Sequence, residues 1–524
     1  MRFNTQSVLS ALAMTVLVFS SCTDQDNIQN STPPFENQDN IKKAVETKGE
    51  FVPGQYIVIL KENQLREVTE TSAQRTALKI NQVLSSTALS RDSVIAEYKY
   101  ATKGFATRLN SQQLELLKLN PLVDRVVKDQ IYRVGGTVLN VDEKHSSNYS
   151  AMRMSQTIPW GITRVGGPHD GTGLTAWVLD SGVDLDHPDL NVDVAKSVNY
   201  VSGEINDDLN GHGTHVAGII GAKNNSMYTV GVAAGATIVS VKTCNFLGDC
   251  DKSDILSGID YITLYASYGD IINMSIWYPN DTVLDDAVKL SVSSGLRYVL
   301  IAGNAKDDAN NYSPGRINGD NIWTVSAFDE NDDFAAVYSC NPDFGSNYGN
   351  STNAPIDYSA PGELILSLYK NGTTATLCGT SQAAPHLAGM LLLNAYSPSL
   401  VTTNGTVNFD PDPVPDNIAV YFPLKVNISG PTSLDSGVQG SWTATPVNGQ
   451  GTSSYQWYYR VDGSSSWVSA GSNSLSWTFT NTTSSTIQAG IKVEITNNYG
   501  PEYAEKEYAV FIQSSGCGPG VFGC

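Results

Sequence analysis

The chain has 524 residues, more than one hydrophobic core usually serves, so a division into three or more domains is expected. Its formal net charge is -20, and a chain this acidic is a poor partner for nucleic acid, whose phosphates repel it. The seven cysteines are compatible with an oxidising compartment.

Residues 1–22 predict an export signal, because Arg2 precedes an apolar run, 8–19, that is too short to span a bilayer. Small residues then lead into Cys22, which resembles a bacterial lipobox, where the signal is removed before a cysteine that carries the lipid. We therefore expect a lipid anchor in the cell envelope or at the cell surface, with release outside the cell as the alternative. The polar stretch 23–50 predicts a disordered spacer.

A small α+β unit is expected over 51–134, from strand and helix patterns in alternation. Strands are predicted at 55–60, 104–109 and 123–127, and helices at 71–84 and 111–119. The next stretch, 135–154, is polar and contains Gly135, Gly136 and a Ser/Asn cluster, which predicts an exposed connector open to proteolysis.

Residues 155–400 alternate apolar strand patterns with helical patterns, which is typical of an α/β, doubly wound and mostly parallel sheet. Strands are predicted at 175–179, 238–242, 271–274 and 298–302, and helices at 212–222, 254–265 and 281–294. Such sheets bind ligands at the carboxyl ends of their strands, where Asp180 and Asn304 lie.

The composition changes again after Tyr396. Residues 401–423, with Asp and Pro in alternation at 410–413, predict a stiff linker. Short alternating stretches over 424–513 are typical of a β-sandwich, with Trp457 as its core tryptophan, and resemble an immunoglobulin-like domain. A tail with two cysteines, 514–524, follows.

Three glycine-rich segments carry an Asp, a His and a Ser in that order, one of three chain orders in which unrelated folds build a serine triad. Asp180 follows an apolar strand, His212 stands between two glycines at a helix start, and Ser381 opens another helix. Asn304 ends a buried strand and is the expected side-chain donor to an oxyanion, with the backbone amide of Ser381 as the second donor.

Together these four motifs resemble the subtilisin family of serine peptidases over about 156–395. The resemblance implies a secreted or surface-anchored endopeptidase that acts on proteins or peptides through an acyl-enzyme and is expected to be a monomer. Residues 51–134 resemble the family's inhibitory propeptide, which implies a self-processed zymogen. Alignment places the cut before Ser155, and any position from Val134 to Met154 stays open.

The substrate-pairing edge implied by the resemblance is Ser275, Ile276 and Trp277, whose bulk replaces the glycines of most relatives and should reshape the subsites. Gln382 stands where a methionine usually follows the nucleophile. A catalytically inert surface binding protein that uses its C-terminal sandwich is the competing hypothesis, and the intact Asp180, His212, Asn304 and Ser381 weigh against it.

The resemblance also implies one structural calcium ion, held by Asp189, Gln156 and Asn225, although all three could equally be solvated loop residues. His187, His215 and His386 are expected to pack rather than catalyse.

Three disulfides are possible, and the sequence does not fix their connectivity. The pairs are Cys244 with Cys250, Cys340 with Cys378, and Cys517 with Cys524. Zinc binding is the weaker alternative, because no histidine lies beside these cysteines.

Overall fold

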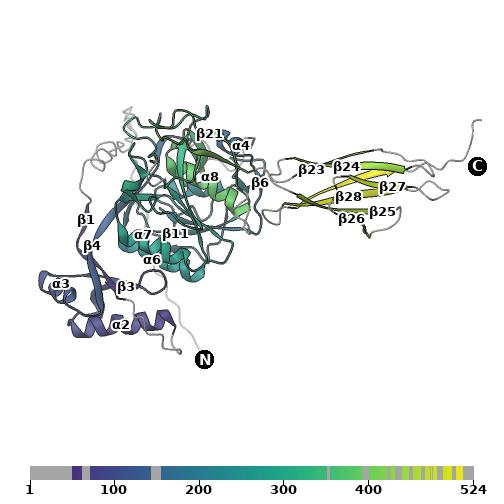
Figure 1. Ribbon diagram of the computed structural model, residues 1–524. Coiled ribbons are helices and arrows are strands. Elements are labelled where there is room, and N and C mark those ends of the chain that lie inside the picture. The colour runs from purple at the N-terminus through teal and green to yellow at the C-terminus, as the bar shows by residue number, and fades with distance from the viewer. Residues whose placement is uncertain are drawn as a thin grey trace, which may run out of the picture. The chain divides into compact units, whose positions relative to one another are not determined.

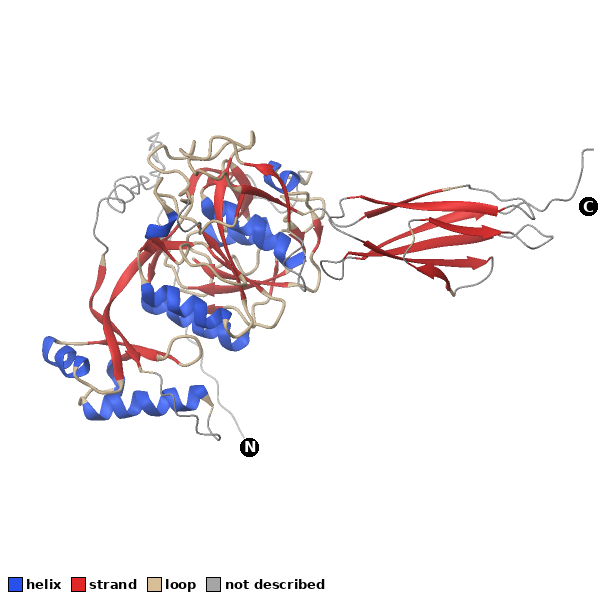
Figure 2. Ribbon diagram, in the orientation of Figure 1, coloured by secondary structure: helices blue, strands red, loops and turns tan. Residues whose placement is uncertain are grey.

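The computed structural model describes residues 50–61, 71–142, 155–350, 355–393 and 401–421, and then 425–430, 439–447, 453–461, 466–472, 474, 476–480, 488–497 and 503–511. Figure 1 shows the elements in chain order and Figure 2 separates helices from strands. The predicted signal with Cys22, the spacer up to residue 49 and the pair Cys517–Cys524 lie outside these residues. Within them, no helix is long and apolar enough to cross a membrane.

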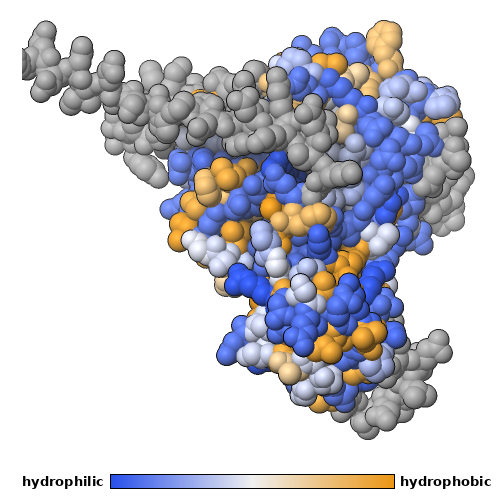
Figure 3. Space-filling view, turned by 90° about the vertical axis from the view of Figure 1, so that its left-hand side faces the viewer, coloured by the Kyte–Doolittle hydropathy of each residue, from blue (hydrophilic) through white to orange (hydrophobic). Residues whose placement is uncertain are grey.

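The expected α+β unit forms a sheet of the order β4-β1-β3-β2 with helices against it. Its elements are β1 (Phe51–Leu60), α2 (Ser72–Ser86), η1 (Arg91–Ser93), β2 (Val94–Tyr98), β3 (Gly104–Arg108), α3 (Ser111–Lys118) and β4 (Val123–Val134). Both helices start with a capping box, on Thr71 and on Asn110, which satisfies amides that the first turn leaves free. Phe105, Ile80 and Val83 belong to its buried core, and Figure 3 shows hydrophobic and hydrophilic residues mixed on its outer surface, at the bottom of that view.

The predicted doubly wound sheet is confirmed in the following domain. Its order is β21-β22-β18-β17-β15-β13-β7-β11-β8, with β9 beside β11, and the pairs from β18 to β8 are parallel. The strands are β7 (Thr175–Asp180), β8 (Asn191–Val192), β9 (Val198–Asn199), β11 (Thr237–Lys242), β13 (Ile271–Met274), β15 (Arg297–Ile301), β17 (Ile322–Phe328) and β18 (Tyr358–Pro361). Because helices cover both faces, the strands from β11 to β18 are buried nearly throughout, whereas β8 and β9 at the edge are partly exposed.

The helices of this domain are α4 (Trp160–Arg164), α5 (His212–Gly221), α6 (Lys252–Tyr265), α7 (Thr282–Val292) and α8 (Thr380–Leu393), with the 3-10 turn η3 (Ala309–Asn311). Helices α6 and α7 pack together on one face of the sheet, and α5 and α8 pack on the other (Figure 1). The domain contains two disulfides, Cys244–Cys250 and Cys340–Cys378.

Short strands outside the main sheet complete the domain. They are β6 (His169–Asp170), β10 (Ala233–Ala234), β12 (Asp249–Asp251), β14 (Ile276–Pro279), β16 (Tyr312–Ser313), β19 (Ile365–Tyr369) and β20 (Thr373–Cys378). Two of them, β12 and β14, accept β4 between them, so the last strand of the α+β unit continues into the α/β domain. The strand predicted at 123–127 is therefore too short.

Two predicted loops are wrong in part. The connector expected at 135–154 begins with buried Gly135 and continues as β5 (Thr137–Asp142), which pairs with β20. The linker expected at 401–423 contains β21 (Thr402–Thr406) and β22 (Asn417–Val420), which extend the main sheet. Ile418 and Val420 are buried against Phe328, and this apolar contact holds the segment to the domain.

The C-terminal residues form two antiparallel sheets. One consists of β23 (Lys425–Ser429), β24 (Gln439–Val447) and β27 (Ser476–Thr480), and the other of β25 (Ser453–Val461), β26 (Val468–Ser472), β28 (Gln488–Asn497) and β29 (Tyr503–Phe511). Trp457 of the second sheet is 1% exposed and stacks on Trp477 of the first, with ring centroids 6.4 Å apart.

Candidate active site

The predicted carboxylate and imidazole meet at the carboxyl end of β7. Asp180 is the last residue of that strand, and His212 is the first residue of α5. His212 Nδ1 lies 2.8 Å from Asp180 Oδ1, and the side chains of His212 and Asp180 are 3% and 0% exposed. A buried carboxylate at this distance fixes the ring orientation and selects the tautomer that has its proton on Nδ1.

The turn that carries His212 is held by Asp208, which the sequence analysis missed. Asp208 Oδ1 accepts the Gly211 amide at 2.8 Å, and Oδ2 accepts the amide and the hydroxyl of Thr214 at 2.9 and 2.6 Å. Gly211 has φ of 106°, and a Cβ there would lie 2.3 Å from the Tyr369 ring. Burial raises the pKa of Asp208, and these donors oppose that shift. An aspartate just before a glycine-started helix was the available signal.

Asn304 directs its amide nitrogen into the cleft because its amide oxygen is fully engaged. Asn304 Oδ1 accepts hydrogen bonds from the backbone amide and the hydroxyl of Thr380, at 2.9 and 2.8 Å, and from Tyr338 Oη at 2.8 Å. Its Nδ2 donates to the carbonyl oxygen of Gly135. Tyr338 is 1% exposed and lies far from Asn304 in the sequence, so no local pattern marked it.

Ser381 lies in the first turn of α8, fully buried, and its Oγ donates to the carbonyl oxygen of Ser275 at 3.5 Å. His212 Nε2 is buried and has no hydrogen-bond partner in the described part of the chain. A Cβ built on Gly135 would lie 2.6 Å from Ser381 Oγ, and one built on Gly136 would lie 2.9 Å from His212 Nε2. Serine and histidine therefore flank the same peptide bond.

The predicted substrate edge is occupied by the chain itself. Ile276 and Trp277 pair antiparallel with Val134 and Arg133, and the Gly135 amide donates to the carbonyl oxygen of Ser275 at 3.3 Å. On its other side, β4 pairs with β12, residue 249 opposite residue 133 and residue 251 opposite residue 131. An extended peptide paired on both edges is how a peptidase cleft takes its substrate.

The other buried histidines are structural, as predicted for His215 and His386. His215 Nε2 contacts the carbonyl oxygens of Ile365 and Ala375 at 3.0 and 3.2 Å, and burial lowers its pKa to about 3. Burial lowers the pKa of His386 to about 4. Neither ring can take up a proton near neutral pH.

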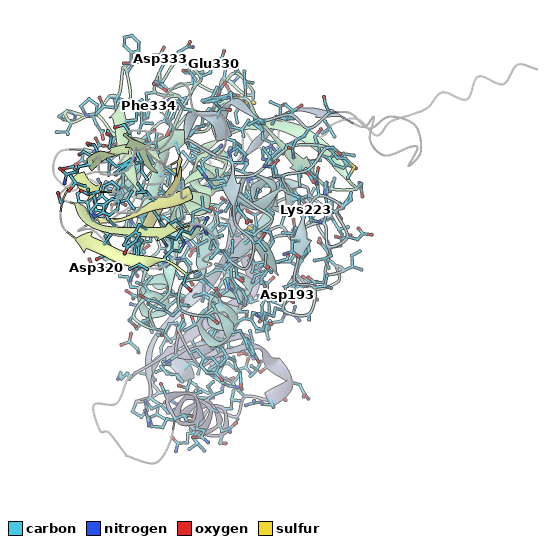
Figure 4. The ribbon with its side chains drawn as sticks, turned by 90° about the vertical axis from the view of Figure 1, so that its right-hand side faces the viewer. Asp193, Lys223, Asp320, Glu330, Asp333 and Phe334 are labelled. Carbon is cyan, nitrogen blue, oxygen red and sulfur yellow. A yellow bond between two sulfur atoms is a disulfide. The ribbon has the colours of Figure 1, made fainter. Side chains whose placement is uncertain are left out.

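The residues predicted to bind calcium lie together. Asp189 is fully buried, its Oδ1 accepts Asn225 Nδ2 at 2.6 Å, and its Oδ2 has no hydrogen-bond partner in the described residues. The Gln156 amide nitrogen lies 2.8 Å from the carbonyl oxygen of Lys223 (labelled in Figure 4) and 2.9 Å from that of Thr229. Burial, only partly offset by Asn225, raises the pKa of Asp189 to about 7. The Asp189 oxygen without a partner is the kind of ligand that Ca²⁺ prefers, whereas Gln156 and Asn225 make these contacts with their amide nitrogens and would have to turn their amide oxygens toward an ion.

Comparison with known proteins gives two family matches. Residues 171–403 match the subtilase family, and residues 55–135 match the peptidase inhibitor I9 family. The chain is 30% identical to proteinase R of Parengyodontium album over 66% of this chain and 80% of that protein. It is also 30% identical to an extracellular serine proteinase of Thermus sp., over 73% of this chain and 88% of that protein.

A third relative, alkaline serine exoprotease A of Vibrio alginolyticus, is 29% identical, and the match covers 67% of this chain and 63% of that protein. A solved cold adapted subtilisin-like serine proteinase is 30% identical and covers 50% of this chain and 98% of its own, with a TM-score of 0.41. Because the chain covers 80% of the Parengyodontium protein and 88% of the Thermus protein at 30% identity, it belongs to the subtilase family, as a subtilisin-like serine endopeptidase made with an inhibitory propeptide.

Proposed function

We propose that Asp180, His212 and Ser381 are the catalytic triad of this endopeptidase and that Asn304 stabilises the oxyanion. The observation that carries the proposal is the Asp180–His212 hydrogen bond of 2.8 Å beside a peptide carbonyl that Asn304 already holds. His212 donates its Nδ1 proton to Asp180, so the lone pair of Nε2 is free to take the Ser381 proton. Asn304, fixed by Thr380 and Tyr338, meets the negative charge without reorganising.

The proposed reaction has two steps, acylation and deacylation, and the same residues serve both. Ser381 attacks the carbonyl carbon while His212 accepts its proton, and His212 then passes that proton to the leaving amine as the acyl-enzyme forms. Water, activated by the same histidine, hydrolyses the ester. The low exposure of His212 and Asp180, 3% and 0% for their side chains, keeps these charges in a poorly solvated site, where they interact more strongly.

The test compares the full chain with Ser381→Ala and with Ser293→Ala, an exposed serine at the end of α7 that serves as control. Wild type and the control should shorten and hydrolyse casein, and Ser381→Ala should do neither while it keeps the same circular dichroism spectrum. If folded wild type cuts neither itself nor casein, the inert surface binding protein becomes the better reading.

We further propose that the protein is exported and anchored by a lipid on Cys22, which the signal pattern supports. Cys22→Ser should move the protein from the membrane fraction to the soluble fraction, and an unchanged distribution would argue against the anchor. Two antiparallel sheets joined by Trp457 and Trp477 support an immunoglobulin-like sandwich at the C-terminus. That the protein is a monomer and does not bind nucleic acid stays a prediction from the sequence.

A calcium ion at Asp189, Gln156 and Asn225 is proposed as a structural cofactor. It would add positive charge beside the buried Asp189 carboxylate, whose Oδ2 accepts no hydrogen bond from the described residues, and it would cross-link residue 156 near the start of the peptidase domain to the loop after α5. Its role is to stabilise the fold, and no step of peptide hydrolysis involves it.

A further inference from the structure

The chain's own segment in the cleft identifies a processing site. We propose that Ser381 cleaves the peptide bond between Gly135 and Gly136, and that the site on both sides of this bond selects glycine. The proposal rests on the triad assigned above and names the bond and the substrate class of that site.

The first observation is the placement of the Gly135 carbonyl group. Its oxygen accepts the hydrogen bond from Asn304 Nδ2, the donor expected to face a developing oxyanion. Its amide donates to the Ser275 carbonyl oxygen at 3.3 Å. Both polar groups of Gly135 are thus held by residues of the peptidase domain, as those of the residue before a scissile bond must be.

The second observation is that the chain continues through the cleft without a break. Before Gly135, β4 lies between β12 and β14, and after Gly136, β5 pairs antiparallel with β20 from residues 137 and 378 to residues 142 and 374. Strand β20 ends two residues before the helix of Ser381. Backbone pairing on both sides fixes the register. Of the bonds that link the two paired segments, Ser381 and His212 flank the one between Gly135 and Gly136.

The third observation is steric and concerns Gly135. A Cβ there would lie 2.6 Å from Ser381 Oγ, 2.8 Å from Ile301 Cδ1 and 2.9 Å from Asn304 Nδ2. Carbon contacts this short are strongly repulsive, since favourable contacts lie at about 3.5 Å or more. Ser381 and Asn304 cannot give way without leaving the positions that the reaction needs, so a larger residue would displace the carbonyl group instead.

Gly136 meets the same restriction on the leaving side. A Cβ there would lie 2.8 Å from His212 Cδ2 and 3.1 Å from Gln382 Nε2. Gln382 is fully buried, and neither its amide oxygen nor its nitrogen has a hydrogen-bond partner within the residues that the structure describes. The unusual glutamine after the nucleophile therefore forms the wall against which the Gly136 position packs.

Trp277 narrows the cleft on the acyl side. Its indole packs at 5.2 Å against the Tyr312 ring, and a Cβ on Gly303, next to Asn304, would lie 3.6 Å from it. The indole thus occupies space beside the Gly303–Asn304 turn that a substrate side chain would otherwise enter. In this proposal, the bulky edge residue acts on the subsites by restricting them.

The reaction balances with water as the only added reactant. Ser381 Oγ bonds to the Gly135 carbonyl carbon and its proton moves to His212 Nε2; the Gly135–Gly136 C–N bond breaks, and that proton leaves on the Gly136 amine. Water then adds to the ester and one of its protons returns to Ser381 Oγ. The products are a propeptide with a carboxylate on Gly135 and an enzyme that begins with the amine of Gly136.

The first test follows self-cleavage of the full chain over time by mass spectrometry and N-terminal sequencing. Wild type and Met154→Pro, which blocks the competing cut before Ser155, should first yield a fragment that starts Gly-Thr-Val-Leu and a propeptide that ends at Gly135. Gly135→Val and Gly136→Val should slow this cut by about 100-fold, and Gly136→Ala by about tenfold, from the usual cost of overpacking. Ser381→Ala should stay whole.

The outcomes separate the two proposals. A Ser381-dependent first cut at another bond, or unchanged rates in the valine variants, overturns this inference and leaves the triad standing. No cut and no casein hydrolysis by folded wild type overturns both. Misfolding of a glycine variant is detected by circular dichroism, and the second test does not depend on such variants.

The second test uses unaltered mature enzyme and fluorogenic peptides. The sequence Arg-Val-Gly-Gly-Thr-Val should be cut between its glycines with kcat/KM about tenfold above the version with Ala for the first Gly, and about 100-fold above the version with Phe there. Equal or better cleavage of the Phe peptide would refute the selection of glycine.

Discussion

One carboxylate of the enzyme binds three backbone amides of the propeptide. Asp260, on α6, is 7% exposed, and its Oδ1 accepts the amides of Tyr100 and Ala101 at 2.6 and 2.8 Å. Its Oδ2 accepts the amide of Lys99 at 2.8 Å. These amides belong to the turn between β2 and β3. Asp260→Asn replaces one acceptor oxygen by a donor and removes the charge from the other, so we expect it to weaken the hold on the propeptide.

The size of the effect follows from these bonds. A hydrogen bond to a charged group contributes about 1.5–3 kcal/mol, and the substitution removes one such bond and weakens two. Burial raises the pKa of Asp260, and the three amides only partly oppose this, so desolvation offsets part of the gain. We therefore expect Asp260→Asn to reduce the free energy of propeptide binding by about 2 kcal/mol, toward the lower end of that range. This corresponds to about 30-fold weaker binding.

The assay is the delay between self-cleavage and full activity, together with the dissociation constant of the cut complex measured by dilution. Asp320→Asn, which changes an exposed aspartate outside α6 (labelled in Figure 4), is the matched control and should behave as wild type. If Asp260→Asn binds the propeptide within twofold of wild type, the three amide hydrogen bonds contribute no net free energy to binding, and this prediction is refuted.

Three further predictions concern pH, calcium and the oxyanion site. Burial, with repulsion from Asp251 and from Asp129 of the propeptide, raises the pKa of Asp254 to about 8. The part of this shift that comes from Asp129 exists only while the propeptide is bound, so the complex holds the Asp254 proton more tightly than the free enzyme does, and propeptide affinity should fall as the pH rises toward 8. Titration of Asp254→Asn should give a flatter profile, and an identical slope would contradict this. Chelation of calcium should lower the melting temperature of wild type but not of Asp189→Ala, and equal shifts would argue against the site. Tyr338→Phe should lower kcat about tenfold with little change in KM, because Asn304 loses one of its orienting bonds, and a changed KM with constant kcat would contradict that role.

The candidate site residues that the sequence predicted lie in short local patterns. Asp180 follows a strand, and His212 and Ser381 open helices next to glycines, so turn chemistry and strand ends revealed their positions. Tyr338 escaped prediction because its role rests on a hydrogen bond to Asn304, which lies far away in the sequence. Asp208 contacts its partners within six residues, and its place before a glycine-started helix is the local signal for the turn of the proposed catalytic base.

The strands that escaped prediction are those whose partners lie far away in sequence. The second half of β4, from Lys128 to Val134, lacks clear alternation because it is paired on both edges and lies in a cleft rather than on one core face. The same holds for β22, whose burial depends on Phe328. A composition rich in Asp and Pro was typical of a linker, and only the contact with the domain overrides it.

Gly135 and Gly136 show why the sequence predicted an exposed connector where the structure places a segment in the cleft. Gly135 and Gly136 were expected in an exposed connector, since Gly-Gly beside polar residues is typical of loops. A side chain is what usually reveals burial in a sequence, and these residues have none, because Ser381, His212 and Asn304 leave no space for a Cβ. Affinity for the segment must then come from its paired backbone, before and after the bond. In the proposed cut, the missing side chains that hide these two glycines in the sequence are also what lets their peptide bond enter the cleft.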